Sequence, residues 1–424
     1  MTLLQRVRFN FYYHALAMLM MAVLVGQTVL AVVPEWNSWI RMVGIILVVV
    51  GSPLLLQRHV FPKEVVLFSA FLYWSIMTGC IVADNQELFL DTVQMLVQMY
   101  ALLLVAFTFF RRYQSLTYCW VLFLVNALFM VLYGAFTEGF SVYSLSAMEH
   151  RLNPLSGTST GANDFGVYAI VGIVSAIALW PRLKLPFQVP LVGFVGILIS
   201  CVFLSGSRKA FIVLLFMIIV IVLIWLAPSY RRWLRGIPLL LLTIVSVYML
   251  VDYAFTNPVI GPRLQASIDE RGDQGREQLY REAIDMFLAN PIAGVGLGNF
   301  AYHSSYHIYA HSDYAEALAG TGLIGFLLYF SIYPFCFIRL YRAMKYAAAH
   351  RQQQRYRELG VVFALLAGYL VLGLGAPNFL DPKAMFFLFA TLGYLYALPI
   401  RGTAASVVCS RKITGGHAIM EVQR

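Results

Sequence analysis

Three groups of polar residues could do chemistry in an otherwise apolar chain. Arg208 and Lys209 follow the turn SGS at 205–207, Arg276 opens a charged stretch, and His311 precedes an apolar run. Guanidinium and ammonium groups bind phosphate and other anions. A histidine near the bilayer surface titrates near neutral pH and can accept a proton. These residue types predict a site that binds an anion and moves a proton.

The first group lies at the start of an apolar run at 210–227. A helix that begins there presents free N–H groups and the positive end of its dipole. With Arg208 and Lys209 added, the corner would suit a phosphate at headgroup depth. The two side chains could instead extend to lipid phosphates without binding a substrate. The charge pattern leaves both interpretations open.

The second group lies on an amphipathic helix predicted from Arg276 to Ala289, which the pair Asn290-Pro291 would end. Its apolar side is made up of Leu279, Met286 and Phe287. Such a helix would lie on the membrane surface with its apolar side down, where Arg276 could bind a lipid-linked phosphate. The alternative is a structural lid with solvated arginines, which is the preferred interpretation for Arg281.

Between the helix and His311 lies a glycine-dense turn. Gly294, Gly296 and Gly298 alternate along the chain and allow close approach of the backbone to a partner. They could form an anion nest, but a tight packing turn is the preferred interpretation. A dinucleotide fingerprint is excluded, because no βαβ unit and no acidic residue at the required distance accompany the glycines.

The third group contains three histidines. The spacing of His303, His307 and His311 would place them on one face of a helix, where two could hold a metal. Since HExxH and CxxC are absent, we predict no metal site and no cofactor. His311 is instead the predicted general base. Glu316 would either orient it or serve as a solvated helix cap.

The elements that must position these residues are membrane helices. The chain has 424 residues, of which 60% are hydrophobic and 12% are charged, against roughly a quarter charged in a soluble domain. The five cysteines form no CxxC pair. We therefore predict an all-α polytopic membrane protein with about twelve spans and no independent soluble domain. The spans are expected near 12–33, 39–57, 65–83, 90–110, 116–136, 164–180, 187–205, 210–227, 237–254, 318–338, 359–376 and 384–400.

The predicted domains follow from these spans. Residues 1–254 would form nine transmembrane helices with short loops, apart from one loop near 137–163. Residues 255–317 would form a long loop that carries the active site, 318–400 three further spans, and 401–424 a tail. Long loops on a rigid scaffold often carry function.

Charge predicts the orientation. If the N-terminus is cytoplasmic, 21 of the 30 basic residues and 3 of the 20 acidic residues lie inside, which gives +18 inside and −8 outside. This distribution follows the positive-inside rule. The net charge of +10 therefore requires no nucleic-acid partner. The long loop would face outward, and the two termini would be cytoplasmic.

The motifs occur in an order that resembles the bacterial O-antigen ligase and polymerase superfamily. They are SGSR at 205–208, NPIAGVGLGNF at 290–300 and HSDYAEALAGTGLIG at 311–325. The stretch from His150 to Asp164 resembles the turn before a span in that family, and adds Arg151 and Asn163 to the substrate-binding residues. The family turn often has Asn-Pro-Asn where this chain has GAN at 161–163.

The resemblance implies a fold of the C-type membrane glycosyltransferase class and an enzyme without nucleotide sugar or metal. The donor would be a polysaccharide on undecaprenyl pyrophosphate, and the acceptor a sugar of lipid A–core. Arg208 and Arg276 would bind the pyrophosphate, together with Lys209. His311 would take the acceptor proton in an inverting displacement at the periplasmic face of the bacterial inner membrane. A monomer is expected.

Three other functions remain open at this stage. An O-antigen polymerase would use the same donor, and a protein O-oligosaccharyltransferase would use a protein hydroxyl as acceptor. A lipid-linked glycan transporter would do no chemistry, but the predicted spans contain few of the charged residues that such a cavity needs. Serine hydrolases and P-loop pumps lose support, since neither GxSxG nor a Walker motif is present.

Overall fold

All the regular structure in the described part of the chain is helical. A computed structural model describes residues 3–30, 37–56, 61–138, 162–226, 230–268 and 274–398. The first helices are α1 (Leu3–Leu30), α2 (Asn37–Leu55), α3 (Lys63–Val82), α4 (Gln86–Tyr113), α5 (Thr117–Glu138), α6 (Ala162–Leu179), η4 (Trp180–Arg182), α7 (Leu185–Leu204), α8 (Arg208–Leu226) and α9 (Tyr230–Thr256). The remaining helices are α10 (Gly261–Ile268), α11 (Gln274–Ala289), α12 (Phe300–His303), α13 (Asp313–Phe330), α14 (Ile332–Ala349), α15 (Gln353–Leu372), η5 (Asn378–Leu380) and α16 (Pro382–Ala397).

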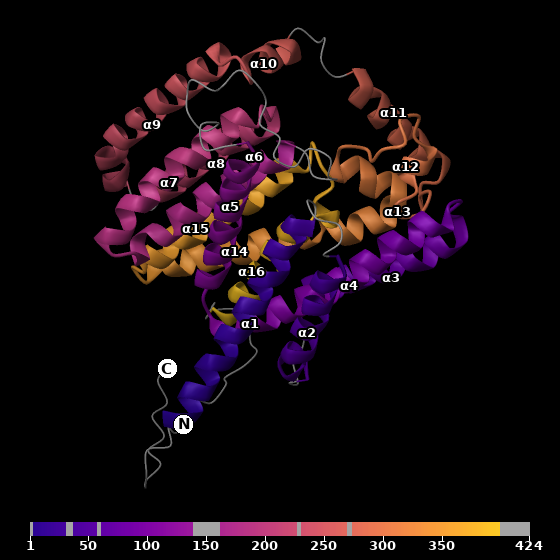
Figure 1. Cartoon of the computed structure of the whole chain (residues 1–424), viewed down its shortest axis with the longest axis horizontal. Helices are drawn as coiled ribbons and strands as arrows, with labels where there is room; N and C mark the ends of the chain where they lie inside the picture. The colour runs from indigo at the N-terminus through magenta and orange to yellow at the C-terminus, as the bar shows by residue number, and fades with distance from the viewer. Residues whose placement is uncertain are drawn as a thin grey trace.

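The prediction of a polytopic helical membrane protein is confirmed. Among the described residues, seven helical segments are long and apolar enough to cross a membrane, and three shorter helices are also apolar. Each of the twelve predicted spans overlaps a helix. The predicted long loop at 255–317 contains α10, α11 and α12, which lie along the upper rim of the molecule in Figure 1.

The centre of the bundle is built from helices that are buried on most sides. Of its apolar window, α6 buries 78%, whereas α7 buries only 33%. Buried aromatic rings fill the centre: Phe68 of α3 packs edge-on against Phe389 of α16, with ring centroids 5.3 Å apart. Trp120 of α5 lies 5.4 Å from Phe387. These central helices form the rigid support on which the loops are held (Figure 1).

The prediction of one continuous helix for the tenth span, 318–338, is wrong. Gly322 has φ 66° and ψ −172°, which breaks the helix inside α13. A short first segment of α13 therefore ends at the break, and a second segment leads past Ser331 into α14. This backbone region is open almost only to glycine. The break creates a shoulder at the bundle end, and the long loop docks on it.

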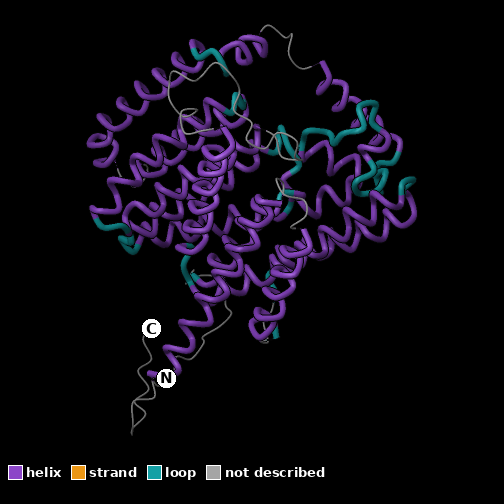
Figure 2. The backbone as a smooth tube through the Cα atoms, viewed as in Figure 1, coloured by secondary structure: helices purple, strands orange, loops and turns teal. Residues whose placement is uncertain are grey.

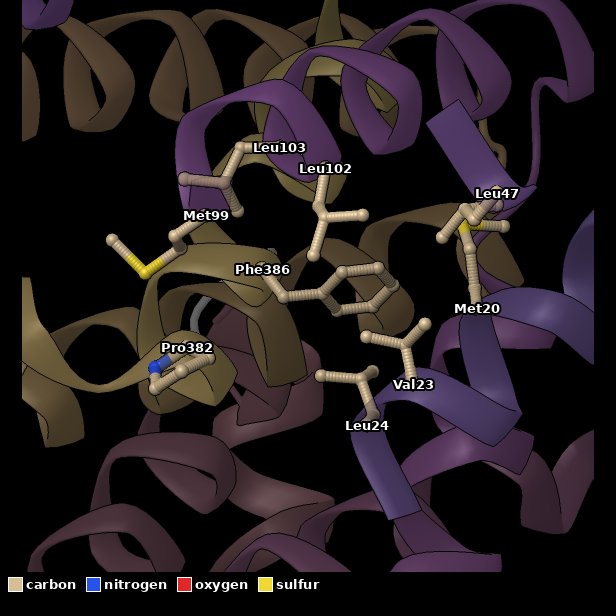
Figure 3. Close-up of a pocket in the computed structure, with 9 residues that line it drawn as sticks. All are labelled: Met20, Val23, Leu24, Leu47, Met99, Leu102, Leu103, Pro382 and Phe386. Atoms are coloured by element: carbon tan, nitrogen blue, oxygen red, sulfur yellow. The ribbon is translucent and has the colours of Figure 1, made fainter. Parts of the chain in front are cut away.

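A small apolar hollow lies between α1, α2, α4 and α16 (Figure 3). Its volume is about 20 Å³, so it has room for one water molecule at most. It offers that water almost no polar partner and is expected to stay dry. Its lining residues are Met20, Val23, Leu24, Leu47, Met99, Leu102, Leu103, Pro382 and Phe386. The hollow is a packing defect beside the first turn of α16, and it is too small for a substrate.

Candidate functional site

The candidate site lies at the end of the bundle where α6, α8 and α16 begin and α15 ends. The turn at 373–375 accepts hydrogen bonds from three separate elements at consecutive carbonyls. The donors are the backbone N–H of Asp313, the hydroxyl of Tyr280 and the ammonium group of Lys209, at 2.7, 2.9 and 3.2 Å. This turn therefore fixes α13, α11 and α8 relative to one another. Figure 2 shows in teal the irregular segments of the long loop near α11 and α13.

The predicted helix at 276–289 is confirmed as α11, and Leu279 and Met286 of its expected apolar side pack against the protein. Leu279 and Ala283 are 2% and 1% exposed, and they pack against a cluster formed by Phe300, Ala310 and Ala319. The first turn of α13 and the long loop thus cover the side that was expected to rest on lipid. Because this contact is apolar and buried, it fixes the position of α11 relative to α13 and the loop before it.

The polar side of α11 holds the loop that follows. The Glu282 carboxylate accepts hydrogen bonds from the Ser305 hydroxyl at 2.6 Å and from the Ser305 N–H at 3.1 Å. The side chain of Gln278 also contacts Ser305 and the Tyr306 hydroxyl. The hydrogen bonds from Ser305 hold the pKa of Glu282 below its ordinary value. Arg281 is exposed and pairs with Glu277, as the solvated interpretation predicted.

The glycine turn is a packing element, as predicted. Gly294, Gly296 and Gly298 have φ angles of 70°, 95° and 78°, which suit glycine. A Cβ at Gly294 would lie 2.4 Å from the Ala319 carbonyl, and one at Gly298 would lie 2.4 Å from the Thr92 hydroxyl. We call residues 294–299 the glycine platform.

The glycine platform joins the two halves of the chain. Its Val295 N–H donates to the Ala319 carbonyl at 2.8 Å. The Asn299 side chain accepts from the Asn85 N–H at 2.8 Å and donates to the Asn85 carbonyl at 3.1 Å. Since Asn299 is buried and doubly bonded, it locks the long loop onto the turn between α3 and α4.

The three histidines do not share one helix face. Helix α12 ends at His303, whose imidazole lies 3.3 Å from the Asp84 carboxylate. His307 and His311 have φ angles of 52° and 54°, which are not helical. The ring of His311 lies 4.3 Å from that of Tyr309, tilted by 56°. The structure thus separates His311 from the other two.

Glu316 holds the backbone just before His311. It is 5% exposed, so the expectation of a solvated cap is wrong. Its carboxylate accepts the N–H of the fully buried Ala310 at 2.7 Å. Ser312 caps α13, because its hydroxyl accepts the Ala315 N–H at 3.4 Å. The carboxylate of Glu316 therefore fixes the backbone position of Ala310, the residue before His311.

Asp313 holds the chain on the other side of His311. Its carboxylate accepts the Phe379 N–H at 3.0 Å and the Tyr329 hydroxyl at 3.2 Å, and the residue is 1% exposed. These bonds tie the start of α13 to η5. Two buried carboxylates thus fix the chain on either side of His311: Glu316 accepts the N–H of Ala310, and Asp313 binds the Phe379 N–H.

The predicted cations converge on the same place. Lys209 lies within electrostatic range of Asp164 and Arg276, and Tyr309 lies within range of the same two residues. Burial raises the pKa of Tyr309, which keeps its hydroxyl protonated at neutral pH. The Tyr309 ring lies beside the His311 ring, so the group formed by Lys209, Asp164 and Arg276 lies near His311. The arrangement can bind an anion next to a proton acceptor.

The other predicted site residues have different positions. Arg208 opens α8, and its guanidinium donates to the Arg263 carbonyl of α10 at 3.4 Å. Asn163 lies in the first turn of α6 beside Asp164. Arg151 lies outside the described residues.

A second charged group, not predicted from the sequence, lies beside the first. Lys383 donates to the Tyr168 hydroxyl at 2.6 Å and lies 3.4 Å from the Asp381 carboxylate. Asp381 also caps α16 by accepting the Lys383 N–H at 3.0 Å and lies within electrostatic range of Lys209. The Asp-Pro pair at 381–382 signals this helix start. No sequence signal shows that Tyr168 of α6 would meet it.

The described residues include no group of three histidine, cysteine or acidic side chains placed to hold a metal ion. Arg208 and Lys209 at this end donate to backbone carbonyls, and Lys383 donates to Tyr168 and lies beside Asp381.

The family comparison covers most of this site. Residues 192–330 match the family model described as O-antigen ligase. The matched segment contains Arg208, Lys209, Arg276, His311 and Glu316. No curated protein matches the chain.

Proposed function

We propose that this chain, a member of the O-antigen ligase family, transfers a polysaccharide from undecaprenyl pyrophosphate to a sugar hydroxyl of lipid A–core. The observation that carries the proposal is the convergence of Arg276 and Lys209 on the neighbourhood of Tyr309 and His311. This arrangement would place cations that can bind an anion and a histidine that can accept a proton at the same end of a membrane bundle.

The cations would bind the donor. A pyrophosphate leaving group gathers negative charge as its bond to the sugar breaks, and fixed cations stabilise that charge. Lys209 is held by the Gly375 carbonyl at 3.2 Å and Arg208 by the Arg263 carbonyl at 3.4 Å. Because both side chains are already oriented, little rearrangement is needed when the donor arrives. Asp164 partly offsets the charge of Lys209 before the donor binds.

His311 would be the general base. The acceptor hydroxyl oxygen attacks the anomeric carbon, the bond from that carbon to the pyrophosphate oxygen breaks, and its electron pair leaves with the pyrophosphate. The hydroxyl proton passes to His311. A single displacement of this kind inverts the anomeric carbon. Glu316 and Asp313 act as positioning residues, because their bonds fix the backbone on either side of His311.

The same chemistry is available to a polymerase or to a protein O-oligosaccharyltransferase, which differ only in the acceptor. A transporter of lipid-linked glycans would need no proton acceptor beside the cations. The site would face the periplasm from the bacterial inner membrane, with both termini cytoplasmic. A reporter inserted at Gly275, where an added side chain would meet only Tyr306 at 3.9 Å, should then be accessible only from the outer side. Labelling from the cytoplasm would contradict this orientation.

The test is a reconstituted transfer assay. Purified protein is mixed with undecaprenyl-pyrophosphate-linked glycan and lipid A–core in EDTA without nucleotide. Transfer to lipid A–core that is lost in His311→Ala and Arg276→Ala would support the proposal. Arg281→Ala is the matched control, since Arg281 lies on the same helix but is exposed and pairs with Glu277.

Other outcomes separate the alternatives. Donor glycan that grows longer while lipid A–core stays unmodified would indicate a polymerase. Glycan found only on added protein acceptor would indicate a protein-glycosylating enzyme. Folded protein without any transfer would favour transport, and full activity in His311→Ala would exclude His311 as the base.

A further inference from the structure

A polar recess lies at the opposite end of the bundle from the candidate site. Two adjoining hollows, of about 420 and 270 Å³, share four lining residues. The larger would hold roughly ten or more waters at about 30 Å³ each. We call this the amide recess; the residues that define it are Gln114, Arg182, Gln353, Gln354, Arg355 and Glu358.

The ends of five elements form the amide recess. It lies between the C-terminal end of α4, η4 after α6, the end of α8, the N-terminal turn of α15 and Tyr394 near the end of α16. The first turn of α15 adds free N–H groups and the positive end of the helix dipole. None of these segments contributes to the candidate site, so the recess is separate from that site.

The side chains in the amide recess are already oriented. Arg182 pairs with Glu358 at 2.8 Å, and the Glu358 side chain is only 9% exposed. Arg355 donates to the Gln352 side-chain carbonyl at 2.9 Å and hydrogen-bonds with the Tyr394 hydroxyl. Since these contacts fix the guanidinium groups before any ligand binds, less conformational entropy is lost on binding.

The charge of the amide recess is positive. Arg182, Arg355 and Arg357 contribute three guanidinium groups, against the single carboxylate of Glu358. The surrounding glutamine amides can donate further hydrogen bonds. Trp225, whose indole N–H donates to the Arg357 carbonyl at 3.2 Å, lines the rim. Tryptophan is enriched at headgroup depth, which favours a position of the recess near the level of lipid phosphates.

We propose that the amide recess binds a phosphate group, carried either by an anionic phospholipid headgroup or by a soluble phosphate ester. Guanidinium groups match phosphate geometry better than ammonium groups do, and basic pockets between membrane helices bind anionic headgroups. The proposal does not depend on the activity at the other end of the bundle.

The test measures binding to the purified full chain by native mass spectrometry. Phosphatidylglycerol, phosphatidylcholine and glycerol 3-phosphate are the three probes. Phosphatidylglycerol should bind about fivefold more tightly than phosphatidylcholine. Arg355→Gln should lower its affinity about fivefold, the factor that corresponds to about 1 kcal/mol per arginine at a membrane surface. Arg342→Gln is the matched control, because Arg342 is an exposed arginine outside the recess.

The outcomes separate the two sources of phosphate. Displacement of phosphatidylglycerol by glycerol 3-phosphate would assign the recess to a soluble ester, and retention would assign it to the lipid. Equal binding of both lipids without binding of glycerol 3-phosphate would overturn the proposal, as would an equal loss in Arg342→Gln. Arg357→Gln serves as the second variant if Arg355→Gln does not fold.

Discussion

Replacing Glu316 by alanine should slow glycan transfer without unfolding the protein. The Glu316 carboxylate is the acceptor for the buried Ala310 N–H, 2.7 Å away. Without it, that N–H loses its partner, at a cost of about 1–3 kcal/mol. The backbone can recover this cost by moving the Ala310 N–H toward water, which carries His311 out of place. Since 1.36 kcal/mol corresponds to a factor of ten, kcat should fall by about 5-fold to 150-fold.

The assay is the reconstituted transfer reaction, with kcat and KM measured separately. Because the fault lies in the position of the base, kcat should fall while KM for the donor changes little. Glu316→Gln keeps an acceptor oxygen and should stay within about threefold of the wild type. Glu277→Ala removes a 63% exposed carboxylate from α11 and should change kcat by less than about twofold. Wild-type kcat in Glu316→Ala, or equal losses in Glu316→Ala and Glu316→Gln, would refute this reasoning.

Three further predictions follow from the loop and its supports. Gly322→Ala should lower the free energy of unfolding by at least about 3 kcal/mol, because its φ of 66° and a Cβ 2.2 Å from the Ile292 carbonyl are both unfavourable. Gly193→Ala, where an added Cβ meets nothing within 4 Å, should leave the melting temperature unchanged; similar Tm values for the two variants would contradict this. The stabilisation from the contact between Glu282 and Ser305 should be fully present above the ordinary carboxyl pKa of 4.5. It should be lost as pH falls through the lower pKa that Glu282 has in the folded protein. After correction for the intrinsic pH dependence of exchange, protection of the Ser305 N–H should then fall at low pH in the wild type but not in Glu282→Gln. Finally, glycan transfer should keep its full rate in EDTA, and restoration of a lost rate by added divalent cation would contradict a metal-free mechanism.

The sequence was sufficient for elements whose signals are local. Periodicity predicted α11 to within two residues of its start, and the Asn-Pro pair after Ala289 predicted its end. The apolar runs predicted where the spans lie. The alternating glycines predicted close backbone approach, and positive φ angles at Gly294, Gly296 and Gly298 confirm it.

Features that depend on distant partners were not predictable. The break at Gly322 exists because α13 meets residues 291–293 there, with the Leu323 N–H bonded to the Pro291 carbonyl at 2.8 Å. The sequence around Gly322 reads as one continuous apolar helix. The histidine spacing was misleading for the same reason, since α12 ends at His303 when the chain turns to meet Glu282 and Asp84.

The charge balance at the site was also beyond local reasoning. Asp164 and Asp381 come from segments more than 200 residues apart, and both act on Lys209. Neither carboxylate lies near Lys209 in the sequence. Only the packing of α6, α8 and α16 at a common end brings them together.

The glycine platform also determines when the site can form during biosynthesis. Asn299 satisfies both backbone groups of Asn85, which is 214 residues earlier in the chain. The turn between α3 and α4 is therefore made and inserted long before its partner leaves the ribosome. Until then, water must hydrate the Asn85 N–H, whereas the Asn85 carbonyl already accepts the Phe89 N–H at 3.2 Å. Because contacts of such long sequence separation form slowly, docking of the platform is expected to be a late step in maturation. A nascent chain that already spans the membrane would still lack the docked glycine platform, which precedes the loop that carries His311.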